Sequence, residues 1–188
     1  MAINQNLSWA QVGAIGTGPG TTVSDAFAAS GATKELLPAG TELYKFSSFQ
    51  TLSSNIYKDN RQKVSPWWSP TLPFKSDIGI IQKKNMAKHF GVSLREWARV
   101  TSVLNEAWSS VAWIIYIRLE QPAYGFFGGF HSLERHAQNG ARSQRAASEA
   151  SGGTRNLPGG GGSYQFYIPN LTMGDVKVIR SEFVSPNA

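Results

Sequence analysis

Four segments of the chain have the hydrophobic and polar pattern of β-strands. Thr41–Ser47 follows the turn-like Pro38-Ala39-Gly40 and alternates between apolar and polar residues. Val111–Leu119 is a continuous β-branched and aromatic run, which is typical of a buried central strand. Tyr164–Ile168 and Asp175–Ile179 complete the predicted set.

Two helices are predicted in the middle of the chain. The first covers Asp77–Phe90, where Asp77 can cap the N-terminus, and its last turns take the basic residues Lys83, Lys84 and Lys88. The second starts at the capping box formed by Ser93 and Glu96, and a stripe at helical spacing contains Leu94, Trp97, Ala98, Thr101, Leu104 and Trp108. Helices between mostly antiparallel strands predict an α+β fold.

Two other segments have few large apolar residues. Because Ala10–Thr33 is rich in Gly, Ala, Ser and Thr, we expect residues 1–34 to form a flexible arm before a globular domain of residues 35–184. At about residues 139–162 the chain combines Ala, Ser and Arg with glycines, including Gly159–Gly162, and we expect a mobile loop there.

Length and composition exclude several classes of protein. With 188 residues, 41% of them hydrophobic, the chain suits one domain with a core of its own. It has no cysteine, which excludes disulfides, thiolate metal sites and cysteine nucleophiles. No apolar run reaches the roughly 18 residues of a membrane span, so we expect a soluble protein. Residues 1–10 lack the pattern of a secretory signal, so any export would use another route.

The positive charge is concentrated in one region. The formal net charge is +6, and residues 54–88 contain seven Lys and Arg against two Asp. Such a region predicts attraction for nucleic acid, a phosphorylated cofactor or an acidic partner. A solvated, Lys-rich surface is the alternative interpretation.

Three short segments combine aromatic and polar residues in ways that suit ligand binding. The first strand would place Tyr44 and Phe46 on one face and Lys45 on the other, which offers an aromatic wall and a cation to a phosphorylated ligand with a flat ring. Trp67-Trp68 stands between two prolines and precedes Ser69, in a segment that prolines make stiff. Gln165 is a polar residue in an aromatic strand, and it needs a partner if buried. An ordinary edge strand, core tryptophans and a structural amide are the alternatives.

In this order, the three segments resemble the ADP-ribosyltransferase-like bacterial toxins, in which NAD lies in a cleft between two small, mostly antiparallel sheets. Tyr44-Lys45 resembles the aromatic and basic pair of that family, with Lys in place of the usual Arg. Trp68-Ser69-Pro70-Thr71 is similar to its Ser-Thr-Ser motif in a loose form. Gln165, four residues before Pro169, stands where the family has its catalytic Glu, and Val176-Lys177-Val178 resembles the strand that follows.

The resemblance implies a toxin or effector that consumes NAD as its substrate, as a mono-ADP-ribosyltransferase or an NAD glycohydrolase, without a metal. It implies catalytic roles for Lys45 and Gln165, and NAD binding by Tyr44, Lys45, Trp68, Ser69, Thr71 and Tyr167. It also implies an acceptor protein or nucleic acid, a cognate immunity protein, and secretion or injection into the cytoplasm of a target cell.

The amide at position 165 leaves the activity open. A neutral amide keeps a hydrogen bond to the ribose but lacks the charge that stabilises the oxocarbenium-like state. The chain is then a weak enzyme, a catalytically inactive binding module, or an enzyme that uses another carboxylate such as Glu149 or Glu182.

A second constellation predicts a different activity. His131 and His136, with Glu134 and Arg135 between them, could cleave RNA by general acid–base catalysis while Arg135 holds the phosphate. Histidines five residues apart do not share a helix face, which disfavours a two-histidine metal site. A basic ribonuclease or nucleic-acid-binding toxin is therefore the alternative hypothesis.

Overall fold

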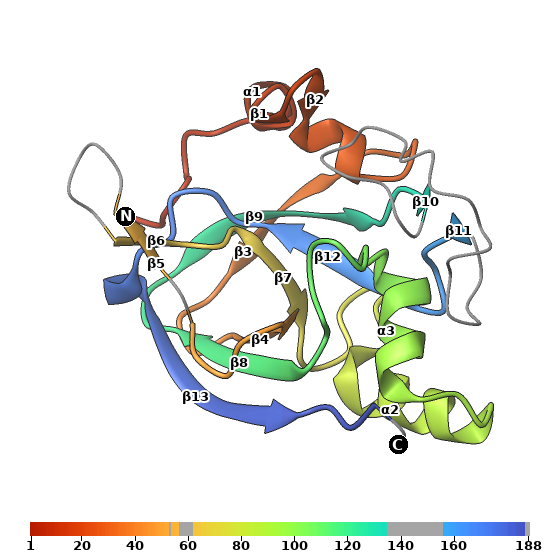
Figure 1. Ribbon diagram of the computed structural model, residues 1–188. Helices are drawn as coiled ribbons and strands as arrows, with labels where there is room; N and C mark the ends of the chain where they lie inside the picture. The colour runs from red at the N-terminus through yellow and green to blue at the C-terminus, as the bar shows by residue number, and fades with distance from the viewer. Residues whose placement is uncertain (53, 57–61, 135–155, 187–188) are drawn as a thin grey trace.

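A seven-stranded antiparallel sheet forms the centre of the protein (Figure 1). The computed structural model describes residues 1–52, 54–56, 62–134 and 156–186. In spatial order the strands are β13 (Val176–Phe183), β8 (Trp113–Leu119), β4 (Glu42–Ser47), β7 (Trp67–Pro70), β12 (Tyr164–Tyr167), β9 (Ala123–Gly129) and β3 (Thr33–Leu37). The α+β prediction is confirmed, whereas the two separate small sheets expected from the resemblance are one continuous sheet.

The short strand β7 joins the two halves of this sheet. On one side it pairs with β4 through Leu43–Pro70 and Tyr44–Ser69. On the other it pairs with β12 through Trp68–Phe166 and Trp67–Tyr167. Because each ladder is only two residue pairs long, part of each neighbouring strand has no strand partner on the β7 side.

Helices and two-stranded ribbons surround the sheet. The helices are α1 (Trp9–Gly13), α2 (Gly79–His89), α3 (Leu94–Ser102) and the 3₁₀-helices η1 (Val23–Ala26) and η3 (Met173–Asp175). The ribbons pair β1 (Gly16–Gly18) with β2 (Thr21–Thr22), β5 (Ser54–Ile56) with β6 (Gln62–Val64), and β10 (Leu133–Glu134) with β11 (Asn156–Leu157). No helix in the described ranges is long and apolar enough to cross a bilayer.

Both predicted helices exist, with shorter ends than the pattern indicated. The Ser93 hydroxyl accepts a hydrogen bond from the Glu96 amide at 3.2 Å, as the capping motif predicts. Helix α3 ends at Ser102 because Val103 adopts a left-handed conformation with φ of 50°, so Leu104 and Trp108 lie beyond the helix. Asp77 lies before α2, where its carboxylate accepts from the Gly79 amide at 2.7 Å.

Strand β4 separates two parts of the core by its alternation. Leu43 packs on one face with Ile115, Ile117 and Phe166. Tyr44 and Phe46 pack on the other face, against α2 and α3. The prediction that Tyr44 and Phe46 share a face is therefore confirmed, and Lys45 lies on the opposite face, over the ring of Trp68.

The N-terminal segment packs against the sheet, contrary to the expectation that it buries little. Val12, Val23 and Phe27 are all buried, and they form a third cluster with Phe126 of β9 and Tyr167 of β12. Three well-spaced apolar side chains are enough for this contact, although the small residues between them dilute the sequence pattern. The expected arm at residues 1–34 therefore contributes α1, η1 and part of the core.

The glycine run before β12 also differs from the mobile loop that we expected. Residues 135–155 lie outside the described part of the chain, but Gly159–Gly162 are described and all have positive φ. A Cβ atom on Gly161 would lie 2.8 Å from Thr101 Cγ2, and one on Gly162 would lie 2.7 Å from Ile78 Cγ2. The glycines thus allow the chain to approach α3 and the start of α2 closely.

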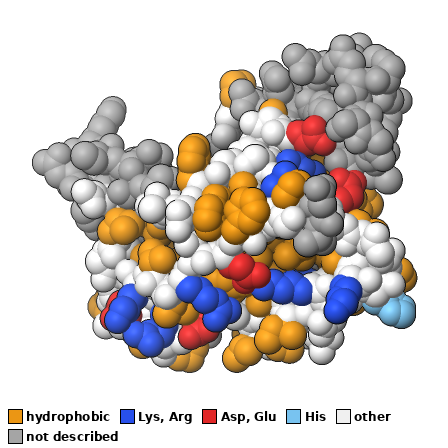
Figure 2. Space-filling model, turned by 60° about the horizontal axis from the view of Figure 1, so that its bottom comes forward, with side chains coloured by type: hydrophobic (Ala, Val, Ile, Leu, Met, Phe, Trp, Pro, Cys, Tyr) orange, Lys and Arg blue, Asp and Glu red, His pale blue; other side chains and the backbone are white. Residues whose placement is uncertain are grey.

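The basic region of the sequence is partly neutralised in the fold. Lys83 is buried in an ion pair with Asp77, Lys75 pairs with Glu35, and Lys84 pairs with Glu182. Figure 2 shows the face of β13 and α2, where Lys and Arg side chains alternate with acidic and apolar ones. This arrangement corresponds to a mixed surface rather than to a continuous basic patch.

Candidate functional site

A cavity of about 490 Å³ lies where the N-terminal segment, β4, β7, β12 and the loop after α3 meet. Its volume is in the range of small-molecule sites. All three segments that the sequence analysis identified contribute to its wall, through Tyr44, Lys45, Phe46, Ser65, Trp67, Trp68, Ser69 and Gln165. These three segments are up to 121 positions apart in the chain, from Tyr44 to Gln165, and the cavity brings them together.

Lys45 supplies a cation to this cavity. Its Nζ lies 5.7 Å from the centroid of the Trp68 ring. Burial lowers the pKa of Lys45 to about 8, because a desolvated ammonium group is less stable than a hydrated one. No carboxylate in the described ranges forms an ion pair with it. An anionic ligand would therefore meet a cation that is not already neutralised.

The aromatic residues of β7 differ in how much surface they offer. Trp68 is buried, and its indole Nε1 donates to the Ser65 carbonyl at 2.7 Å. Trp67 is half-buried and packs edge-on against Tyr167, with 4.6 Å between centroids. Trp108, beyond α3, also lines the cavity and is half exposed. Trp67 and Trp108 are the tryptophans that present ring surface to a ligand.

Two of the residues assigned to NAD by the resemblance lie away from the cavity wall. Tyr167 belongs to the buried cluster of the N-terminal segment. Thr71 directly follows β7 and is buried against the first turn of α2, where its carbonyl accepts from the Ile80 amide at 3.0 Å. Neither residue is part of the cavity wall.

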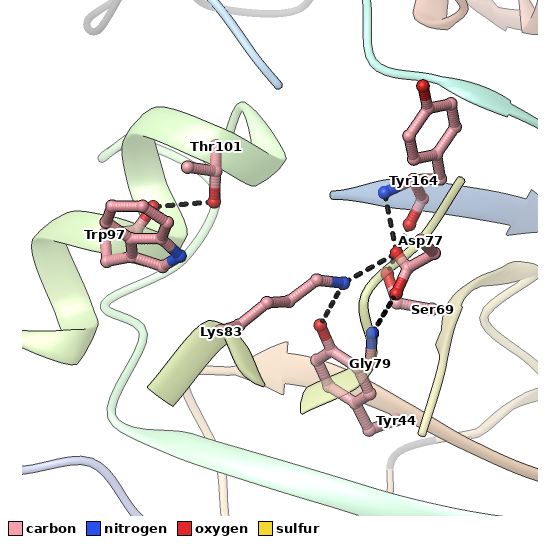
Figure 3. Close-up of polar contacts among 8 residues, drawn as sticks. All are labelled: Tyr44, Ser69, Asp77, Gly79, Lys83, Trp97, Thr101 and Tyr164. Atoms are coloured by element: carbon pink, nitrogen blue, oxygen red, sulfur yellow. Dashed lines mark hydrogen bonds and ion pairs between the residues drawn. The ribbon is translucent and has the colours of Figure 1, made fainter. Parts of the chain in front are cut away.

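A buried polar network supports the cavity from beneath (Figure 3). Lys83 Nζ lies 2.6 Å from Asp77 Oδ2 and donates to the Tyr44 hydroxyl at 3.0 Å. All three residues are buried. Burial raises the pKa of Tyr44 well above its usual value and lowers that of Lys83, which the negative charge of Asp77 opposes. The Tyr44 ring thus forms part of the cavity wall, and its hydroxyl already accepts a hydrogen bond from Lys83.

Asp77 of this network and the neighbouring Ser69 hold the backbone of Tyr164, the residue before Gln165. Asp77 Oδ2 accepts from the Tyr164 amide at 2.8 Å, and the Ser69 hydroxyl donates to the Tyr164 carbonyl at 2.9 Å (Figure 3). The ladder between β7 and β12 does not reach Tyr164, so these side chains satisfy backbone groups that no strand satisfies. The result is a fixed backbone directly before Gln165.

The Gln165 amide is held by one backbone carbonyl. Its Nε2 donates to the Ala26 oxygen at 2.8 Å, and the His131 amide donates to the same oxygen at 3.0 Å. No group in the described ranges donates to Gln165 Oε1. Because a glutamate in this conformation would put a carboxylate oxygen against a carbonyl oxygen, the position fits an amide.

The second constellation is described only in part. His131 is exposed and lines the same cavity as Lys45 and Gln165. Glu134 lies on β10, whereas Arg135 and His136 lie outside the described residues. Of the other carboxylates considered, Glu182 pairs with Lys84 and accepts from the Tyr116 hydroxyl, and it does not line the cavity. Glu149 lies outside the described residues.

Sequence reasoning missed a carboxylate of the cavity wall, Asp25 of η1. Hydrogen bonds from the Thr22 amide and hydroxyl, and the nearby His131, lower the pKa of Asp25. The spacing Thr22-x-x-Asp25 is a capping-box signal, which could have identified a turn here but not its position at a cavity. Among the described residues, no group of three or more acidic or imidazole side chains could hold a metal ion.

Comparison with known proteins found one distant structural neighbour. No family model matches the chain, and no curated protein matches it. Among solved structures, the chain is similar to Tne2 in the structure of Tne2 in complex with Tni2, with a TM-score of 0.41 and 11% sequence identity. The alignment covers 81% of this chain and 92% of Tne2. This distant similarity concerns the arrangement of the chain alone.

Proposed function

We propose that the cavity binds NAD and that the protein consumes it, as a toxin or effector that resembles the ADP-ribosyltransferase-like toxins. One observation supports this proposal above the others. The segments at residues 44–46, 67–69 and 165 resemble NAD-binding motifs, and all three line one cavity of suitable size.

The chemistry of the wall suits a ligand that combines flat rings with phosphates. Trp67 and Trp108 offer ring surface for stacking, and Lys45 offers an unneutralised cation to a phosphate. Gln165 Oε1 can accept a hydrogen bond from a ribose hydroxyl, while its Nε2 stays on the Ala26 carbonyl. Ser102, whose buried hydroxyl has no partner in the described ranges, adds a further polar group to the wall.

In this proposal the residues position the ribose and exclude water from one side of it. The buried Lys83–Asp77 pair and Ser69 hold β4 and β12, so the Lys45 and Gln165 backbones do not need to reorganise when NAD binds. The nicotinamide–ribose bond is then cleaved, and the ribose passes to water or to a protein or nucleic-acid acceptor. Action in a target cell, with a cognate immunity protein as partner, belongs to the same proposal.

Titration calorimetry and an NAD-consumption assay test the proposal. Wild-type protein should bind NAD and release nicotinamide, and Lys45→Met should weaken binding by about tenfold or more, because it removes a charge-assisted contact. Lys84→Met is the matched control, since Lys84 pairs with Glu182 outside the cavity. Absence of binding at millimolar NAD would refute the proposal.

The ribonuclease hypothesis predicts a different result in a parallel assay. Total RNA incubated with the wild type should stay intact if the cavity acts on NAD. Cleavage of RNA that is lost in His131→Ala, in protein that does not bind NAD, would favour the ribonuclease instead.

A further inference from the structure

Asp25 is the only carboxylate among the described residues that line the cavity. This matters because cleavage of the nicotinamide–ribose bond develops positive charge on the ribose, and an anion stabilises that charge. The resemblance places a glutamate at position 165, but the chain has an amide there that is committed to the Ala26 carbonyl. An active enzyme would therefore need a carboxylate from another part of the wall, and among the described residues Asp25 is the one available.

The structure fixes Asp25 at the cavity by two local contacts. Its Oδ2 accepts from the Thr22 amide at 2.7 Å and from the Thr22 hydroxyl at 3.0 Å. No group in the described ranges donates to its Oδ1, so this oxygen is available to a ligand. The same hydrogen bonds lower the pKa of Asp25, because they stabilise its ionised form.

A third contact couples Asp25 to Gln165 through the neighbouring residue. The Ala26 carbonyl accepts both from Gln165 Nε2 at 2.8 Å and from the His131 amide at 3.0 Å. The amide of β12 thus holds the short helix that carries the carboxylate. In the motif that the chain resembles, one glutamate binds the ribose and stabilises its positive charge. Here the Gln165 amide can bind the ribose and the Asp25 carboxylate can stabilise the charge.

We propose that Asp25 is the catalytic carboxylate of this cavity, which stabilises the positively charged ribose while Gln165 positions η1. This inference rests on the proposed function. In the step, the bond between the ribose carbon and the nicotinamide nitrogen breaks, and its electron pair neutralises the pyridinium nitrogen. Water then adds to the ribose carbon and gives its proton to the solvent, so the products are nicotinamide, ADP-ribose and one proton.

The structure contains a matched control for the capping role of Asp25. Asp175 caps the start of η3 in the same way, because its Oδ2 accepts from the Thr172 amide at 2.8 Å and from the Thr172 hydroxyl at 2.7 Å. Asp175 does not line the cavity. Substitution at either position alters the same kind of capping contact, and at Asp175 it also alters a hydrogen bond from the Gln121 amide, but only substitution of Asp25 removes a charge from the cavity.

Asp25→Gln and Asp25→Glu test the inference, because Gln and Glu both occupy this position of a capping box and differ in charge. We expect Asp25→Gln to lower kcat for NAD hydrolysis by about 100-fold or more, with less than a threefold change in the Kd for NAD. Asp25→Glu should keep kcat within about tenfold of the wild type. Asp175→Gln should match the wild type in kcat and lower Tm at least as much as Asp25→Gln, because it also alters the contact with Gln121.

The outcomes separate this inference from the proposed function. If Asp25→Gln turns over NAD as fast as the wild type, the catalytic assignment is wrong and the NAD proposal stands. If Asp25→Gln and Asp25→Glu lose kcat equally while both remain folded, the charge is not what matters, and the assignment is again overturned. If the wild type binds no NAD, both proposals fall together.

Discussion

Replacing Lys83 by Met should lower the free energy of unfolding by about 3 kcal/mol, because it leaves a buried carboxylate without its cation. Lys83 Nζ lies 2.6 Å from Asp77 Oδ2, and the two side chains are 2% and 0% exposed. Methionine keeps most of the aliphatic stem, so the change removes charge without opening a large cavity.

The structure limits this loss to the lower part of the range for broken buried pairs, which is about 3–5 kcal/mol. Asp77 retains hydrogen bonds from the Gly79 amide at 2.7 Å and from the Tyr164 amide at 2.8 Å. These contacts continue to stabilise the carboxylate when Lys83 is gone. For a chain of this length each kcal/mol corresponds to about 2–4 °C in Tm, so we expect Tm to fall by about 6–12 °C.

Urea denaturation followed by tryptophan fluorescence measures the effect, with Lys84→Met as the control from the next position of α2. Lys84 pairs with Glu182 at 2.6 Å, but these side chains are 30% and 40% exposed, and such a pair contributes at most about 1 kcal/mol. If Lys83→Met costs no more than Lys84→Met at an unchanged m-value, the reasoning about the buried pair is refuted.

Three further expectations follow from the cavity and its surroundings. Gln165→Glu should lower the free energy of unfolding by about 1–3 kcal/mol and reduce NAD turnover, because a carboxylate would face the Ala26 carbonyl, and Gln165→Ala should reduce turnover further. A rise in turnover for Gln165→Glu, measured beside thermal melts, would instead place the catalytic charge at position 165. The affinity for NAD should fall as pH rises through about 8, because a phosphate binds the protonated Lys45, and calorimetry between about pH 6.5 and 9.5 should show that Lys45→Met abolishes this dependence. Gly162→Ala should destabilise the protein by about 1–3 kcal/mol more than Gly160→Ala in the same urea assay. Both glycines have positive φ, but only a Cβ at position 162 would meet a neighbour, Ile78 Cγ2, at 2.7 Å. Equal losses of stability would contradict the close approach of Gly162 to Ile78.

The sequence predicted the elements whose local signals agree with their tertiary setting. β4, β8 and β12 have strong strand patterns, and α3 has its Ser93 cap. β9 was missed because its glycines carry no strand propensity. A Cβ at Gly128 would lie 2.5 Å from the Gly31 oxygen, so this glycine is required by a neighbour that is distant in sequence.

The residues of the candidate site divide in the same way: those in characteristic local sequences were predictable, and those placed by long-range contacts were not. Lys45, Ser69 and Gln165 could be identified because each stands in a recognisable run of residues. Asp25 could not, because it lies in a segment whose composition indicated an unpacked arm. Its position depends on the contact between Ala26 and Gln165, which are 139 residues apart.

The cavity wall takes residues from Thr17 near one end of the chain to Gln165 near the other. Asn4 likewise donates to the Pro169 carbonyl at 2.6 Å, across 165 positions. Such long-range pairing makes folding slow compared with that of a helical protein. A ribosome must therefore release the chain through Gln165 before the wall can close, so a nascent or truncated chain that lacks β12 carries no assembled cavity.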